Sequence, residues 1–186
     1  MTSKIATLLM ILPLQAFATE FEFKLNNDMA ELGLSQFQSN LLNGVNVGAN
    51  LLFNEKNDIV VSGRLLTGSS AQYEKANIQT GIGVKAYGFA LDEKNNQFYS
   101  IALGARVRLN QLNQTPFSFS AEAYFAPDIT TSGLADGVRE ISVNGDMKIS
   151  KNAYAFLGLR QLSISQSNAG NYKLDSGLHL GVQLNF

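Results

Sequence analysis

The sequence predicts an all-β protein, a small antiparallel transmembrane β-barrel of about ten strands. Apolar and polar residues alternate with a period of two in segment after segment, and polar, turn-forming clusters separate these segments. Because successive side chains of a strand point to opposite faces, each segment has one apolar and one polar face. The third observation is an N-terminal stretch with the layout of a secretory signal peptide.

The N-terminal stretch has the three parts of a signal peptide in the expected order. Lys4 supplies positive charge, residues 5–14 are apolar, and Ala16-Phe17-Ala18 forms a small-x-small cleavage site. The apolar run is too short for a helix that spans a bilayer, which needs roughly 20 residues. We therefore expect residues 1–18 to be removed and residues 19–186 to form the barrel domain.

Composition sets limits on the class of the mature chain. Its 168 residues (186 minus 18) carry 13 basic and 15 acidic side chains and no cysteine. Such a balance gives no support for nucleic-acid binding, which usually shows a basic stripe. After residue 14 no apolar run approaches the length of a spanning helix. If this chain crosses a membrane, it does so as a closed sheet, which satisfies every backbone group in lipid.

Individual strands can be placed from the alternation and the turns. Counting back from the C-terminus, we expect strands at 172–186, 153–164, 139–150, 116–126, 97–110, 77–90, 58–67 and 44–54. Turn-forming clusters separate many of them, at 54–58, 92–96, 110–116, 150–152 and 165–171. The lengths are near the 9–11 residues that cross a bilayer at a tilt.

The segment 20–36 decides the number of strands. If both termini lie on the same side of the membrane, the strand number is even. Splitting 20–36 into two short strands around Asn26-Asn27-Asp28 gives ten strands. Eight strands remain the alternative, with 20–36 partly outside the barrel.

The positions of aromatic residues favour a membrane barrel over a soluble one. On the apolar face they form two groups, Phe21, Phe117 and Phe186 at the end with the termini, and Phe53, Tyr99, Phe125 and Tyr172 at the other end. Two aromatic girdles that flank an apolar band are typical of outer-membrane barrels. In a soluble sandwich or lipocalin-like barrel the apolar face would point inward instead. We therefore expect the apolar face outside and the charges in the lumen.

The inward face collects charges of both signs. We expect a lumen charge network formed by Arg64, Lys85, Arg106, Arg108, Glu122, Asp146, Arg160 and Asp175. Enclosed charges must be paired or hydrated, so Arg106, Arg108 and Arg160 should pair with Glu122, Asp146 and Asp175. Such a network either fills the barrel or lines a narrow, selective pore.

The C-terminal segment resembles known outer-membrane proteins. Leu178, Leu180, Val182 and Leu184 lead at every second position to Phe186, similar to the signal that the barrel assembly machinery reads. The stretches EAYFAPDIT (122–130), LGLRQLSI (157–164) and DSGLHLGVQLNF (175–186) resemble the YfaZ family of predicted outer-membrane proteins. Where that family usually has Gly-Tyr-Arg, this chain has Gly158-Leu159-Arg160. The resemblance implies a porin-like barrel and no specific activity.

We therefore expect a protein of the cell outer membrane, in contact with its lipids and with the assembly machinery, that passes small ions or water at most. A structural or surface-interaction barrel is the alternative, and a barrel hydrolase is a third. His179 is the single histidine, and a hydrolase would need Ser163 or Ser165 and an acid such as Asp175 beside it. We expect no enzyme, no cofactor and no metal site, since a second histidine and cysteine are both lacking.

Overall fold

The computed structural model describes residues 19–38, 44–73, 76–92, 96–110, 115–133, 135–166 and 170–186, which form a closed antiparallel barrel of ten strands. The predicted fold class is confirmed. The eight-strand alternative is wrong, because the segment around 20–36 forms two paired strands in the wall. The predicted signal peptide, residues 1–18, lies outside the described residues.

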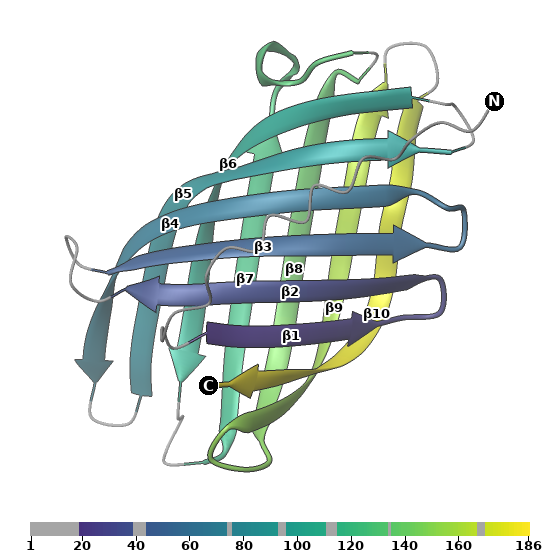
Figure 1. Ribbon diagram of the computed structural model, residues 1–186. Helices are drawn as coiled ribbons and strands as arrows, with labels where there is room; N and C mark the ends of the chain where they lie inside the picture. The colour runs from purple at the N-terminus through teal and green to yellow at the C-terminus, as the bar shows by residue number, and fades with distance from the viewer. Residues whose placement is uncertain are drawn as a thin grey trace.

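Each strand pairs with its neighbour in the chain, and pairing of the first strand with the last closes the wall (Figure 1). The strands are β1 (Thr19–Leu25), β2 (Met29–Gln38), β3 (Val45–Asn54), β4 (Ile59–Tyr73), β5 (Ala76–Leu91), β6 (Asn96–Asn110), β7 (Phe117–Ala126), β8 (Gly137–Lys148), β9 (Ala153–Gln166) and β10 (Gly170–Asn185). A short 3-10 helix, η2 (Asp128–Thr130), lies between β7 and β8. No helix in the described ranges is both long and apolar enough to cross a membrane.

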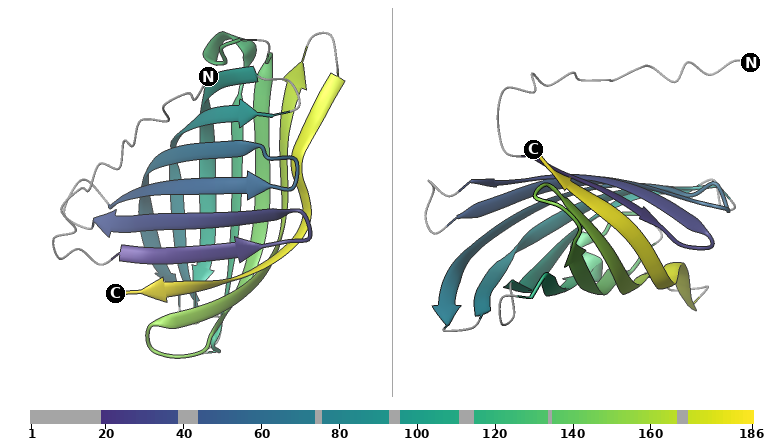
Figure 2. Two further views of the ribbon diagram at one scale, coloured as in Figure 1. Left: turned by 45° about the vertical axis from the view of Figure 1, so that its right-hand side comes forward. Right: turned by 90° about the horizontal axis from the view of Figure 1, so that it is seen from below.

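The barrel has two distinct ends. The terminal end holds the start of β1 and the finish of β10; the loop end holds the β1–β2, β3–β4, β5–β6, β7–β8 and β9–β10 connections. The front strands β1–β4 cross the rear strands β7–β10 in projection, as expected of tilted strands in a closed wall (Figures 1 and 2).

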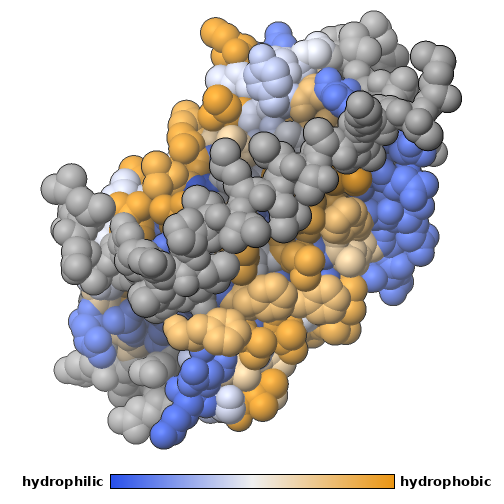
Figure 3. Space-filling view, viewed as in Figure 1, coloured by the Kyte–Doolittle hydropathy of each residue, from blue (hydrophilic) through white to orange (hydrophobic). Residues whose placement is uncertain are grey.

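Side-chain burial confirms that the barrel is inside-out relative to a soluble protein. Large apolar side chains are exposed along the outer face of the wall, as at Ile82, Leu103 and Leu159. Charged side chains such as Glu140 and Arg160 are buried in the lumen. Figure 3 shows apolar residues over the visible wall and hydrophilic ones gathered toward the strand ends. This is the polarity of a barrel immersed in lipid.

The structure extends β4 beyond its predicted end at residue 67. Residues 68–73 read GSSAQY and continue pairing with β5 as far as Tyr73 opposite Ala76. Alternation stops at residue 67 because these residues are small or polar on both faces. The backbone ladder nevertheless persists at the terminal end, so the hairpin extends past the apolar band.

The predicted outward position of Tyr172 is wrong. The register between β9 and β10 shifts between Lys173 and Asp175, so both Leu174 and Asp175 are buried. This β-bulge places one extra residue on β10 and reverses the facing of the residues before it. The Tyr172 ring consequently packs against the buried core, and its hydroxyl donates to Asp58 Oδ2 at 2.7 Å.

Candidate functional site

The lumen changes character along its axis, and β5 shows the change on one strand. Its inward residues include Gln79, Gly81 and Gly83 toward the terminal end, continue with Lys85, and finish with the apolar set Tyr87, Phe89 and Leu91. Because every second residue faces inward, the inward residues of β5 pass through three zones of the lumen in order. We call them the vestibule, the charged layer and the apolar plug.

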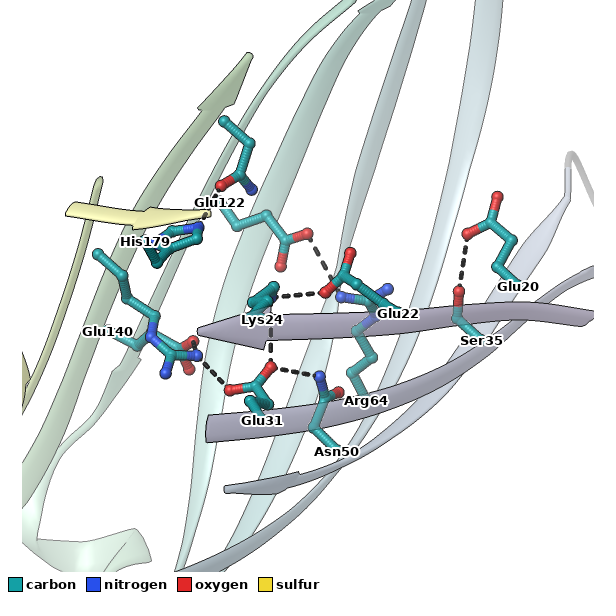
Figure 4. Close-up of polar contacts among 12 residues, drawn as sticks. Glu20, Glu22, Lys24, Glu31, Ser35, Asn50, Arg64, Glu122, Glu140 and His179 are labelled. Atoms are coloured by element: carbon teal, nitrogen blue, oxygen red, sulfur yellow. Dashed lines mark hydrogen bonds and ion pairs between the residues drawn. The ribbon is translucent and has the colours of Figure 1, made fainter. Parts of the chain in front are cut away.

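The charged layer is centred on Arg160 of β9, whose side chain is buried. Its Nε donates to Asp175 Oδ2 at 2.5 Å, and its Nη1 donates to Glu31 of β2, across the barrel. Glu31 also accepts from Lys24 Nζ at 3.2 Å and from Asn50 Nδ2 at 2.7 Å. One guanidinium thus joins β9, β10 and β2, and Figure 4 shows Glu31 of β2 with its further partners Lys24 and Asn50.

A second buried pair lies beside the first. Lys85 Nζ donates to Glu140 Oε2 at 2.7 Å, and the Tyr87 hydroxyl donates to the same oxygen at 2.5 Å. The ammonium also lies 5.1 Å from the ring centroids of Tyr87 and Tyr124, within the range of cation–π attraction. Arg160 Nη1 lies 4.0 Å from Glu140, which joins the two clusters into one layer.

Toward the terminal end the pairs are longer. Glu122 lies between two arginines, with Arg64 Nη1 at 3.4 Å and Arg106 Nε at 3.2 Å from its Oε1. Arg108 Nη2 lies 3.4 Å from Asp146 Oδ2. The structure therefore brings all eight residues of the expected lumen charge network to the interior, and places Arg106, Arg108 and Arg160 beside Glu122, Asp146 and Asp175 respectively.

The apolar plug closes the loop end. Phe89 and Phe98 stack at 4.5 Å between ring centroids, and Tyr87 continues the stack at 5.6 Å from Phe89. Further buried members come from six other strands: Met29, Leu52, Val60, Val138, Leu162, Ile164 and Leu174. Water and ions that enter from the loop end therefore meet packed apolar side chains before they reach the charged layer.

Free volume lies on the other side of the charged layer. The vestibule, bordered by Glu20, Gln72, Arg108, Lys148, Tyr154 and Gln183, has a volume of about 740 Å³. Between the charges themselves the cavity shrinks to about 20 Å³. A water molecule needs roughly 10–15 Å³ measured in this way, so the layer has room for about one.

The lone histidine lies away from the residues that a hydrolase would need. His179 Nε2 is 2.7 Å from Asn144 Oδ1, and its ring meets Phe156 edge-on at 6.0 Å. In the register of β9 and β10, His179 lies opposite Gly158, whereas Ser163 and Ser165 lie opposite Lys173 and Asn171. Asp175 is paired with Arg160. Gly158 makes room for the histidine, since a Cβ there would lie 2.7 Å from Nε2. Among the described residues, no set of three or more histidine, cysteine, aspartate or glutamate side chains is placed to hold a metal ion.

The C-terminal residues of the expected assembly signal, Leu180, Val182, Leu184 and Phe186, are exposed on the outside of the wall. The first three lie opposite Leu25, Phe23 and Phe21 of β1, where the barrel closes.

Two carboxylates of the charged layer, Glu140 and Glu31, were not predicted from the sequence to belong to the lumen charge network. Glu140 had the inward parity but was not assigned a partner, and Glu31 was not assigned to the lumen. A signal existed for Glu31, because it has the same parity as Met29 and Gly33 in a strand whose other face carries Leu32 and Leu34.

Comparison with known proteins identifies the family of the chain. No curated protein matches the chain. A solved KdgM porin is 8% identical over 91% of this chain and 99% of its own, with a TM-score of 0.45. A solved NanC porin is 9% identical over 92% of this chain and 100% of its own, with a TM-score of 0.43. The family model described as YfaZ precursor matches residues 2–186, and the chain therefore belongs to the YfaZ family.

Proposed function

We propose that this chain is an exported protein of the outer membrane whose lumen is blocked, so that it passes water or small ions at most. The terminal end then faces the periplasm and the loop end faces the outside. The lumen charge network acts as filling that holds the wall together and excludes solutes. It does not line an open channel.

One observation carries the proposal: two different barriers cross the lumen in series. Next to the loop end, apolar side chains from many strands pack together, led by the stacked Phe89 and Phe98. Next to them on the side of the terminal end, Arg160, Lys85 and their carboxylate partners occupy the cross-section of the lumen. A cavity of about 20 Å³ remains between these charges. A solute larger than water would have to displace both.

The test is electrical. Folded protein is inserted into a planar bilayer, and heat-modifiable gel migration verifies that the barrel has formed. We expect no large, stable conductance steps at either polarity. Large steps, or uptake of sugar-sized solutes by vesicles that contain the protein, would overturn the closed-lumen proposal.

A second candidate function, contact with a partner outside the cell, is favoured by one loop. The segment after β7 folds back onto β6, where Ser100 bridges Thr131 and Ser132 N donates to the Tyr99 carbonyl. This leaves the side chain of Ile129 on η2 91% exposed at the rim. A photo-crosslinker at position 129 in intact cells should give a discrete adduct if a partner binds there, and one at Lys56 on the β3–β4 turn is the control.

A further inference from the structure

A side cavity opens from the lumen on the terminal side of the charged layer. It has a volume of about 220 Å³, and its lining includes Glu20, Asn46, Gln79, Gly81, Arg106 and Arg108. Glu20, Gln79 and Arg108 border the vestibule as well. The cavity is therefore reached from the terminal end, while the charged layer and the plug block it from the loop end.

The two arginines of this cavity have unused donor capacity. They occupy successive inward positions of β6, and the Nε of each is buried without a hydrogen-bond acceptor among the described residues. Arg106 Nε lies 3.2 Å from Glu122 but is not aligned for a hydrogen bond, and Arg108 Nη2 is 3.4 Å from Asp146. Charge-assisted N–H···O bonds are normally about 2.7–2.9 Å long, a range that neither arginine reaches.

We propose that the side cavity binds a small soluble oxyanion, a molecule that carries one phosphate or carboxylate group. A guanidinium presents a planar fork of N–H donors that matches the oxygens of such groups. The lining itself carries two guanidiniums and one carboxylate, that of Glu20, so a ligand with a single negative charge balances the groups that face the cavity. The ligand is water-soluble because the cavity communicates with the aqueous vestibule. This inference rests on the proposed function in one respect: the terminal end, from which the ligand enters, is assigned to the periplasm.

Gly81 offers a way to fill the cavity without altering any charge. A Cβ at Gly81 would have its nearest heavy atom, Leu66 Cβ, at 3.5 Å, which is ordinary contact. At neighbouring Gly68 a Cβ would lie 1.8 Å from the Thr80 carbonyl oxygen, which excludes any side chain. The wall therefore admits a Cβ at position 81, and because Gly81 lines the cavity, we expect a leucine there to project into the space that the ligand would occupy.

The experiment measures binding of inorganic phosphate to the folded, detergent-solubilised barrel by equilibrium dialysis, with acetate as a competitor that tests the carboxylate chemistry. We expect saturable binding at one site that weakens at least about tenfold, or about 1.4 kcal/mol, in Gly81→Leu and in Arg106→Gln. Arg139→Gln is the matched control, because Arg139 is exposed on β8 near the loop end. Binding should be unchanged in that variant.

Two results would overturn the site: no saturable binding of phosphate or acetate, or binding that survives Gly81→Leu. Because Gly81→Leu keeps every ion pair, it tests the site even where Arg106→Gln fails to fold. Conductance is measured on the same preparation. An open lumen with intact phosphate binding overturns the proposed function and supports the site, whereas a closed lumen without binding overturns the site alone.

Discussion

Glu122 is a single carboxylate that serves two arginines from different strands. Arg64 of β4 and Arg106 of β6 both lie within 3.4 Å of its Oε1. Removal of one partner from a buried pair is costly because the remaining charge stays buried without compensation. We predict that Glu122→Ala lowers the free energy of unfolding by about 3–5 kcal/mol, and by less where water reaches the arginines. Denaturant unfolding in detergent or lipid measures it.

The control for this prediction is Glu55→Ala, since Glu55 is exposed on the β3–β4 turn. An unfolding midpoint of Glu122→Ala that matches this control would show that the arginines are already hydrated in the native barrel.

Leu103 and Gly104 are neighbours in sequence that face opposite environments. Leu103 is 69% exposed on the outer face, whereas a Cβ at Gly104 would lie 2.1 Å from the Tyr124 ring and 2.5 Å from the Ala123 carbonyl oxygen. We predict that Leu103→Arg costs about 2–4 kcal/mol in lipid, because a charge then faces the hydrocarbon. In detergent, where the new guanidinium can reach water, the loss of stability should be smaller.

Gly104→Ala should be harmful in both media, because its clash is with the backbone and a ring inside the barrel. Equal folding yields of Leu103→Arg and the unmodified protein in lipid vesicles would contradict the placement of this face in the membrane.

At the level of the elements, the buried Asp58 forms hydrogen bonds to three connections at the loop end. Asp58 Oδ2 accepts from Asn54 Nδ2 at 3.0 Å and from the Tyr172 hydroxyl at 2.7 Å, and its Oδ1 accepts from the Asp92 amide at 3.1 Å. The β3–β4 turn, the end of β5 and the start of β10 thus share one anchor.

We predict that Asp58→Ala destabilises the loop end by about 1.5–3 kcal/mol, the range for hydrogen bonds to a charged group. Tyr172→Phe, which removes a single donor, should cost less. Amide hydrogen exchange should show faster exchange in the β3–β4 turn and at the start of β10, with the terminal end unaffected. Uniform acceleration over the whole barrel would contradict a local anchor.

The last strand carries the expected signal for assembly. We predict that deletion of Phe186, 75% exposed on the outside, lowers the yield of folded barrel in cells. The melting temperature of the barrels that do form should change little, because the ring is not packed in the lumen. Pulse-chase assays of heat-modifiable protein measure the yield. Deletion without loss of yield would remove Phe186 from the proposed signal, and Ile149→Ala, which alters another exposed apolar residue at the same end, is the control.

Much of this architecture could be predicted from alternation alone, because one residue in two faces lipid. The outer positions of Leu103 and Phe125 and the inner positions of Arg160 and Glu122 follow directly from parity. Parity fails where a residue is inserted. The β-bulge near Leu174 reverses the facing of Tyr172, and nothing in the local sequence marks it.

The apolar plug could not be predicted from the sequence, for a different physical reason. Toward the loop end the strands are apolar on both faces, as where buried Phe98 is followed by exposed Tyr99. Alternation identifies the lumen only when the lumen is polar, so this region reads as uninterrupted strand without a face. The inward run Tyr87, Phe89 and Leu91 of β5 was visible in the sequence, but its meaning depends on packing against the distant Leu162 and Ile164.

At the level of the whole molecule, the proposed seal consists of two barriers of different chemistry placed one after the other along the axis. The plug opposes ions because it offers them no hydration. The charged layer opposes solutes because oppositely charged groups pair across the narrow lumen. In a series arrangement either barrier alone blocks flow, so weakening one leaves the barrel closed.

Three variants test this arrangement. Phe89→Ala with Phe98→Ala thins the plug, and Lys85→Ser with Glu140→Ser opens the charged layer without changing the net charge. The third variant combines all four substitutions. We predict that conductance in planar bilayers stays near that of the unmodified protein in both double variants and rises sharply in the combined one, a non-additive result expected of barriers in series. Gel migration and circular dichroism verify that each variant forms a barrel. If thinning the plug alone gives the full conductance, the charged layer is permeable to ions, and the plug is the whole seal.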